Sequence, residues 1–66
     1  MTRSNLIDAE VIFQTSTEKA VCVRETEGGP DVWLPLSQVE IAGEPRRGGI
    51  VTLTAPEPLL IEKGML

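Results

Sequence analysis

Trp33 is the most informative residue in this chain. The sequence holds one tryptophan, one phenylalanine, and neither tyrosine nor histidine. An indole ring offers a large apolar area and one N–H donor, which needs a partner when it is buried. Trp33 therefore marks either the centre of a small core or the anchor of a binding surface. A stacking platform for a nucleobase is a further alternative.

The best candidate for a charged-ligand site is Arg46-Arg47-Gly48-Gly49. Two guanidinium groups beside two glycines can hold a phosphate, because arginine binds phosphate oxygens with paired hydrogen bonds and glycine exposes backbone N–H groups. The alternative is an ordinary polar loop between two strands. Arg24 would join this site only if the fold brings it close.

Ser37 and Gln38 follow the tryptophan and complete the set of candidate binding residues. Their side chains would either contact a ligand beside Trp33 or satisfy backbone groups in the bend after Pro35. The sequence leaves both alternatives open.

Catalytic chemistry has little support in the residue types. Without histidine, the chain lacks a general base that titrates near neutral pH. Cys22 lies between Val21 and Val23, where a thiol behaves as a small hydrophobic side chain. The acidic pair Glu25 and Glu27 flanks a glycine turn and is typical of a solvated hairpin tip. The sequence therefore predicts a protein that is not an enzyme and has no catalytic residue.

The composition limits the remaining classes. Sixty-six residues make one domain, and a formal net charge of −4 argues against tight binding to a nucleic-acid backbone. One cysteine excludes an internal disulfide, and the lack of histidine argues against a metal site. We expect no cofactor. With no stretch of transmembrane length and no recognisable export signal, we expect a cytoplasmic protein that does not enter a membrane.

Self-association is the expected source of additional stability. A chain of this length buries only about 60% of the surface that its unfolded state exposes. Small domains usually rely on disulfides, a metal or oligomerisation, and the first two are unsupported here. The sequence therefore predicts a homo-oligomer.

Short β-strands are the elements that must position these residues. From runs of apolar and β-branched residues, we expect strands at 11–13, 18–26, 31–34 and 50–55. The glycine- and proline-containing segment 27–30 gives the strongest turn signal. Residues 1–8 are expected to be a flexible polar lead-in.

The connections complete the expected fold. Segment 37–40 has the spacing of a helix start, but Gly43 and Pro45 follow, so we expect one 3₁₀ turn or a bent strand. Segment 58–63 should form one or two helical turns, with Gly64 as a left-handed cap. The fold class is all-β: a small curled antiparallel sheet, or an SH3-like or OB-like barrel, of four to five strands with a short C-terminal helical turn.

A motif runs through the middle of the chain. Its most specific piece is Trp33-Leu34-Pro35 with Ser37-Gln38, preceded by the strand 19–23 and followed by the strand 50–54 and the closing segment 62–64. Over residues 19 to 65 this pattern resembles a group of small, mostly uncharacterised phage and prophage proteins. Leu36 stands where we would expect lysine in that group, and Pro58 where we would expect a second tryptophan. The resemblance implies a phage-borne protein in the host cytoplasm and implies no activity.

Two functions follow from these observations. The first is inhibition or modulation of a host protein or defence complex by occlusion, with Trp33 as the anchor and the acidic residues as a steering surface. The alternative is binding or sequestration of a nucleotide or single-stranded nucleic acid, with Arg46 and Arg47 on phosphate and Trp33 on the base.

Overall fold

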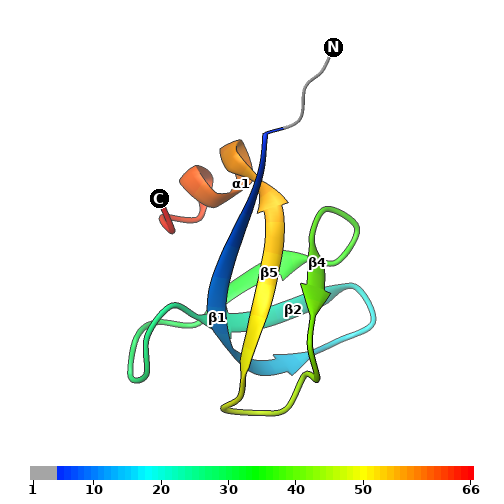
Figure 1. The fold of residues 1–66 in the computed structure, drawn as a ribbon, viewed down its shortest axis with the longest axis vertical. Helices are drawn as coiled ribbons and strands as arrows, with labels where there is room; N and C mark the ends of the chain where they lie inside the picture. Colours follow the sequence, from blue (N-terminus) through cyan, green and yellow to red (C-terminus); the bar gives the residue numbers. More distant parts are fainter. Residues whose placement is uncertain (1–4) are drawn as a thin grey trace.

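The computed structural model describes residues 5–66, which form a single antiparallel β-sheet and one short helix. The elements are β1 (Leu6–Ser16), β2 (Ala20–Arg24), β3 (Val32–Pro35), β4 (Glu40–Ala42), β5 (Ile50–Pro56) and α1 (Glu57–Glu62). The strand order is β3-β2-β1-β5-β4 (Figure 1). This confirms the prediction of a small curled antiparallel sheet with a C-terminal helical turn.

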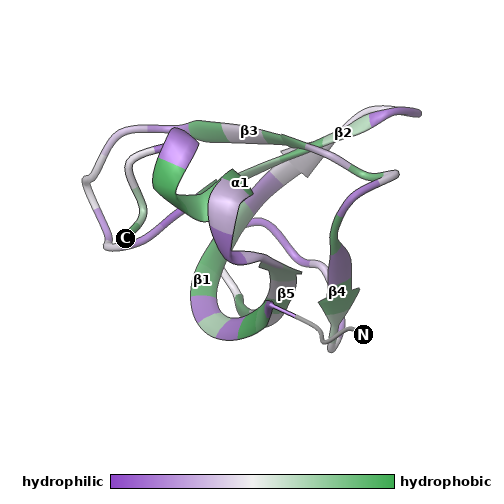
Figure 2. Cartoon of the chain, turned by 90° about the horizontal axis from the view of Figure 1, so that it is seen from above, coloured by the Kyte–Doolittle hydropathy of each residue, from purple (hydrophilic) through white to green (hydrophobic). Residues whose placement is uncertain are grey.

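The long central strand β1 divides the sheet into two layers. Its first part pairs with β5 from Leu6↔Pro56 to Ile12↔Ile50, and its last part pairs with β2. A β-bulge between Phe13 and Thr15 separates the two parts, and bulges bend a strand. As a result, β4 and β5 run upright in Figure 1 while β2 and β3 cross behind them. Seen from above, α1 lies between the two layers (Figure 2).

The sheet does not close into a barrel, so that alternative is wrong. Within residues 5–66, β3 pairs with β2 alone and β4 pairs with β5 alone. The two edge strands belong to different layers and run in crossing directions (Figure 1). They therefore leave an opening between them instead of a ladder of hydrogen bonds.

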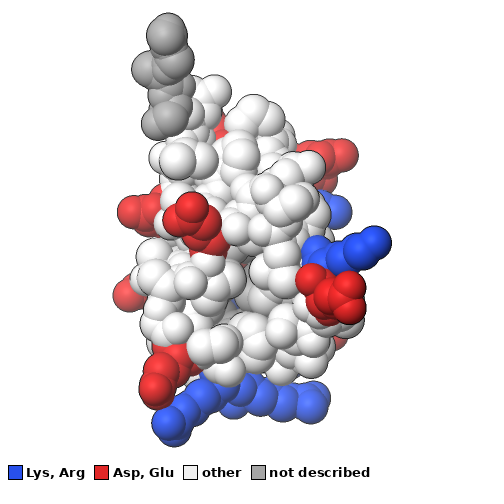
Figure 3. Space-filling model, turned by 90° about the vertical axis from the view of Figure 1, so that its right-hand side faces the viewer, with Lys and Arg blue, Asp and Glu red and all other residues white. Residues whose placement is uncertain are grey.

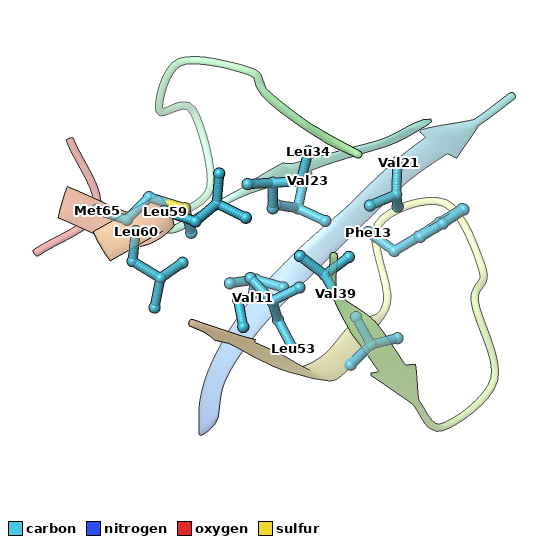
Figure 4. Packing of buried hydrophobic residues seen from close by; sticks show 12 residues of the cluster. Val11, Phe13, Val21, Val23, Leu34, Val39, Leu53, Leu59, Leu60 and Met65 are labelled. Carbon is cyan, nitrogen blue, oxygen red and sulfur yellow. The ribbon is translucent and has the colours of Figure 1, made fainter. Parts of the chain in front are cut away.

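The core fills the space between the layers. Alternating residues of β1 and β5 point inward, and Val11, Leu53 and Ala55 are almost fully buried. Val23 and Leu34 meet them from the crossing layer, as Figure 4 shows. The remaining buried hydrophobic side chains are Phe13, Val21, Cys22, Val39, Val51, Leu59, Leu60 and Met65.

The terminal helix ends as predicted. Gly64 adopts a left-handed conformation with φ of 77°, and its N–H donates to the carbonyl of Ile61 at 3.0 Å. The N–H of Met65 then donates to the carbonyl of Leu60 at 2.8 Å, which returns the Met65 side chain to the core. This helix is too short to cross a membrane, and no other helix lies in the described part of the chain.

Several element boundaries differ from expectation. Of the predicted lead-in, residues 1–4 lie outside the described residues, but β1 already begins at Leu6. The reason is an alternation in which Ile7 and Ala9 turn inward while Asp8 and Glu10 face solvent. The segment predicted as a 3₁₀ turn or bent strand is a turn over 36–38, after which β4 begins at Glu40.

Candidate binding face around Trp33

Trp33 lies on the outer face of the edge strand β3. Leu34, its neighbour, is fully buried, whereas Trp33 is 45% exposed. This exposure rules out the core alternative for Trp33. The N–H of Leu36 donates to the carbonyl of Lys19 at 2.8 Å, and in an antiparallel ladder only every second pair of residues is hydrogen-bonded. Counting from this pair, Trp33 is not hydrogen-bonded to β2, so its backbone N–H and C=O point toward the free edge of β3.

Cys22 lies on the same outer face of the sheet as Trp33. It pairs directly with Trp33 across the strands, at a position where the two residues exchange no backbone hydrogen bonds. Such pairs bring side chains of one face especially close together. Cys22 is only 2% exposed although it belongs to the outer face, which is consistent with cover by its cross-strand neighbour Trp33. Burial raises the pKa of the Cys22 thiol, and the charge of Asp31 raises it further.

Two arginines border the same face. Arg24 lies two residues beyond Cys22 in β2, and its Nε donates to Oδ1 of Asp31 at 2.5 Å. The positive charges of Arg24 and Arg47 both act to lower the pKa of Cys22, against the larger effect of burial. The charge of Arg24 and that of Arg47, from the loop 43–49 (the arginine loop), thus both reach Cys22. Such proximity to the loop is what Arg24 needs in order to join the predicted site.

The arginine loop is held against β1 by two backbone hydrogen bonds. The N–H of Gly48 donates to the carbonyl of Phe13 at 2.7 Å, and the N–H of Phe13 donates to the carbonyl of Gly49 at 2.8 Å. These bonds place Arg47 next to the bulge of β1, which in turn adjoins Cys22. Basic side chains gather at the lower end of the molecule in Figure 3, the end at which Figure 1 shows the loop between β4 and β5.

The two predicted phosphate-binding arginines therefore differ. Arg46 pairs with Glu44 at 3.2 Å on the exposed surface of the loop. Arg47 is the one whose charge reaches Cys22. The glycine N–H groups are engaged within the protein, because Gly49 donates to the carbonyl of Arg46 at 2.8 Å and Gly48 donates to Phe13. The expected backbone cradle for a phosphate is thus not free, and only guanidinium groups remain to hold one.

Ser37 and Gln38 lie elsewhere. They form the turn after β3, where the N–H of Gln38 donates to the carbonyl of Pro35 at 3.0 Å. Both line a hollow of about 350 Å³ whose other walls are Leu6, Leu36, Val39, Glu40 and Thr54. The five predicted binding residues thus occupy three places: Trp33 lies on the outer face of β3, Arg46 and Arg47 lie on the loop before β5, and Ser37 and Gln38 line the hollow.

Sequence reasoning missed two surface features. The first is this hollow beside β4, which is lined in part by the exposed side chain of Leu6. It was missed because residues 1–8 were expected to be a flexible lead-in. The second is Ile50, which is 68% exposed and pairs with Ile12 on the outer face. The signal for the first was the alternation of residues 6–11, which extends β1 to the rim of the hollow.

Among residues 5–66, no group of three or more Cys, Asp or Glu side chains is placed to hold a metal ion. Comparison with protein families, with curated proteins and with solved structures finds no match for this chain.

Proposed function

We propose that this protein is a non-enzymatic, phage-type binding protein that inhibits or modulates a partner protein by occluding part of its surface. The observation that carries the proposal is the exposure of Trp33, the chain's one tryptophan, on the outer face of a free edge strand. Tryptophan is enriched at the centres of protein interfaces, where a few anchors supply most of the binding energy. The resemblance of the surrounding motif to phage proteins supports a host protein or defence complex as the partner and the host cytoplasm as the place of action.

The surroundings of Trp33 support an interface. The strand Val32–Pro35 carries no charged residue, and the nearby Asp31 is paired with Arg24. An anchor with neutral or neutralised neighbours can lose its water at moderate cost. The remaining acidic side chains of a protein with net charge −4 would steer it toward a basic partner.

The test compares two exposed hydrophobic residues. Wild-type protein, Trp33→Ala and the control Ile61→Ala are immobilised, and the proteins retained from a bacterial host extract are quantified. Ile61 is 57% exposed and belongs to α1, not to the edge strand β3. We expect one host protein to be retained by wild type and by Ile61→Ala but lost with Trp33→Ala, and its purified activity to fall when wild-type protein is added. Equal retention by both variants would refute the role of Trp33.

A nucleotide or single-stranded nucleic acid is the second candidate ligand. The specific observation in its favour is that the charges of Arg24, which is paired with Asp31, and of Arg47 both act on Cys22, the residue directly opposite Trp33. This candidate predicts that nucleotides raise the melting temperature of wild-type protein by mass action. Arg47→Ala should abolish the rise and Arg46→Ala should preserve it, because Arg46 pairs with Glu44 instead. A protein-directed inhibitor would show no such rise.

Self-association is part of the same proposal. The core has to stabilise a small chain in which Cys22 is the one cysteine. Light scattering at micromolar concentration should give a mass above 7.2 kDa. A monomer that melts cooperatively at high temperature would contradict this part alone.

A further inference from the structure

An apolar hollow lies in the opening between the two edge strands. It measures about 140 Å³ and is lined by Phe13, Ser16, Val21, Leu36, Ile41, Gly43 and Pro45. Ser16 supplies the one polar side chain in this wall. Leu36 also lines the larger hollow described above, so the two depressions adjoin each other. Figure 3 shows this side of the molecule, with a depression near its centre.

The edge strand beside this hollow has backbone groups available for pairing. The N–H of Glu57 donates to the carbonyl of Asn5, and the N–H of Phe13 donates to the carbonyl of Gly49. Because hydrogen-bonded pairs alternate along an antiparallel ladder, the odd-numbered residues of β5 bond to β1. The even-numbered Thr52 and Thr54 therefore bond to β4, at its residues Ala42 and Glu40. The N–H and C=O of Ile41, between them, therefore point away from β5 and toward the opening.

The size of the hollow defines the side chain that would fill it. An apolar cavity of about 150 Å³ holds a benzene molecule, so this hollow is large enough for one leucine or isoleucine side chain. An extended segment hydrogen-bonded to β4 would place alternate side chains on its inner face, next to Ile41. Backbone pairing and one aliphatic side chain would thus be satisfied together.

The charges around β4 define the flanks of the occupant. Glu40 lies next to Ile41 and is exposed, whereas Glu44, on the other side of Ile41 along the chain, is paired with Arg46. A second copy of this chain would bring another Glu40 and a further net charge of −4 to the edge. A segment with basic residues beside its aliphatic side chain complements Glu40 and the net negative charge instead, and opposite charges across an interface select such partners.

We propose that the free edge of β4 accepts an extended segment of a partner protein as an additional strand, with an aliphatic side chain in the hollow and basic residues beside it. Strand addition at a sheet edge is a recurrent mode of peptide recognition, in which the backbone gives affinity and the pocket gives specificity. This surface is separate from Trp33, so loss of function in Trp33→Ala neither supports nor weakens it.

The probe is the capped peptide Thr-Lys-Leu-Thr-Leu-Lys-Thr, whose leucines share one face and whose lysines share the other, added to ¹⁵N-labelled protein and followed by NMR. We expect shift changes centred on the amides of Leu36, Ile41 and Gly43, and slower hydrogen exchange at the Ile41 N–H. The same peptide with glutamate in place of both lysines should bind at least about tenfold more weakly, a difference of about 1.4 kcal/mol. No shift change at millimolar lysine peptide, or changes confined to other strands, would overturn the proposal.

Two variants with the same added charge test the hollow itself. Leu36→Lys puts an ammonium group on the wall shared by both hollows, whereas Ile50→Lys replaces a highly exposed isoleucine at the start of β5. Desolvation of the charge should weaken peptide binding to Leu36→Lys by about tenfold or more, with less than about a twofold change in Ile50→Lys. Equal weakening in both would refute an apolar pocket. If the spectrum of Leu36→Lys is that of an unfolded chain, the wild-type exchange rate at Ile41 decides the question.

Discussion

Replacing Trp33 by alanine should both destabilise the fold and uncover Cys22. Trp33 is 45% exposed, so roughly half of its side chain is removed from water on folding. An aromatic side chain buries about 200 Å² when fully covered, which makes the buried part about 100 Å². At about 25 cal/mol per Å² the substitution should lower the free energy of unfolding by about 2.5 kcal/mol. A chain of 66 residues has a stability of roughly 3–10 kcal/mol, so most molecules should stay folded.

The assay measures two quantities on each variant. Urea denaturation gives the loss of stability, and labelling by a thiol reagent gives the accessibility of Cys22 in the native state. If Cys22 reacted only through global unfolding, a loss of about 2.5 kcal/mol would accelerate labelling about 60-fold. Because Cys22 lies directly opposite Trp33 on the outer face, we expect labelling of Trp33→Ala to exceed that factor and to approach the rate in denaturant.

Leu60→Ala is the matched control. Leu60 is 1% exposed on α1, and its truncation should cost about 2–5 kcal/mol while Trp33 remains in place. Labelling of this variant should rise only as far as its measured loss of stability requires. If Trp33→Ala behaves in the same way as Leu60→Ala, the tryptophan does not cover Cys22 and our account of the face is wrong.

Three further outcomes are expected. Leu53→Ala should lower the free energy of unfolding by about 2–5 kcal/mol in urea, because Leu53 is completely buried between the layers; a loss below about 1 kcal/mol would contradict this packing. Because burial raises the pKa of Cys22, the thiol loses its proton at a lower pH in the unfolded chain than in the folded one. Wild-type stability should therefore fall above about pH 8.5 relative to Cys22→Ala. Parallel pH profiles of the two proteins would speak against a raised pKa. Gly64→Ala should lower stability by about 1 kcal/mol, since φ is 77° there, and an unchanged melting temperature would show that the cap is dispensable.

The strands could be predicted where local pattern and tertiary contacts agree. The run Val21-Cys22-Val23 is buried on both faces, as its composition indicates: Val21 and Val23 belong to the core, and Cys22 lies on the outer face directly opposite Trp33. The turn at Gly28 and the cap at Gly64 require positive φ, which glycine adopts without strain, and both were recognisable as glycine positions. These features depend on residues close together in the sequence.

The candidate site could be predicted only in part, because it depends on register. A shift of one residue would turn Trp33 into the core and Leu34 into solvent, and the segment Val32-Trp33-Leu34 is apolar in either case. The difference between Arg46 and Arg47 depends on the hydrogen bonds between Gly48 and Phe13, which no local pattern encodes. The smaller, apolar hollow next to Ile41 depends on the crossing of two strands from different layers, and composition does not reveal such a crossing.

The central position of β1 has a consequence for how this protein is made. Of the five strands described, β1 is synthesised first and is the one that both layers need, yet its partner β5 begins only at Ile50. The ladder joins Leu6 to Pro56, and contacts so distant in sequence make folding slow because a long loop must close first. Until β5 arrives, β1 can pair only with β2, and its first half presents an unpaired, partly apolar edge. The chain should therefore be most vulnerable to aggregation and proteolysis before β5 has paired with β1.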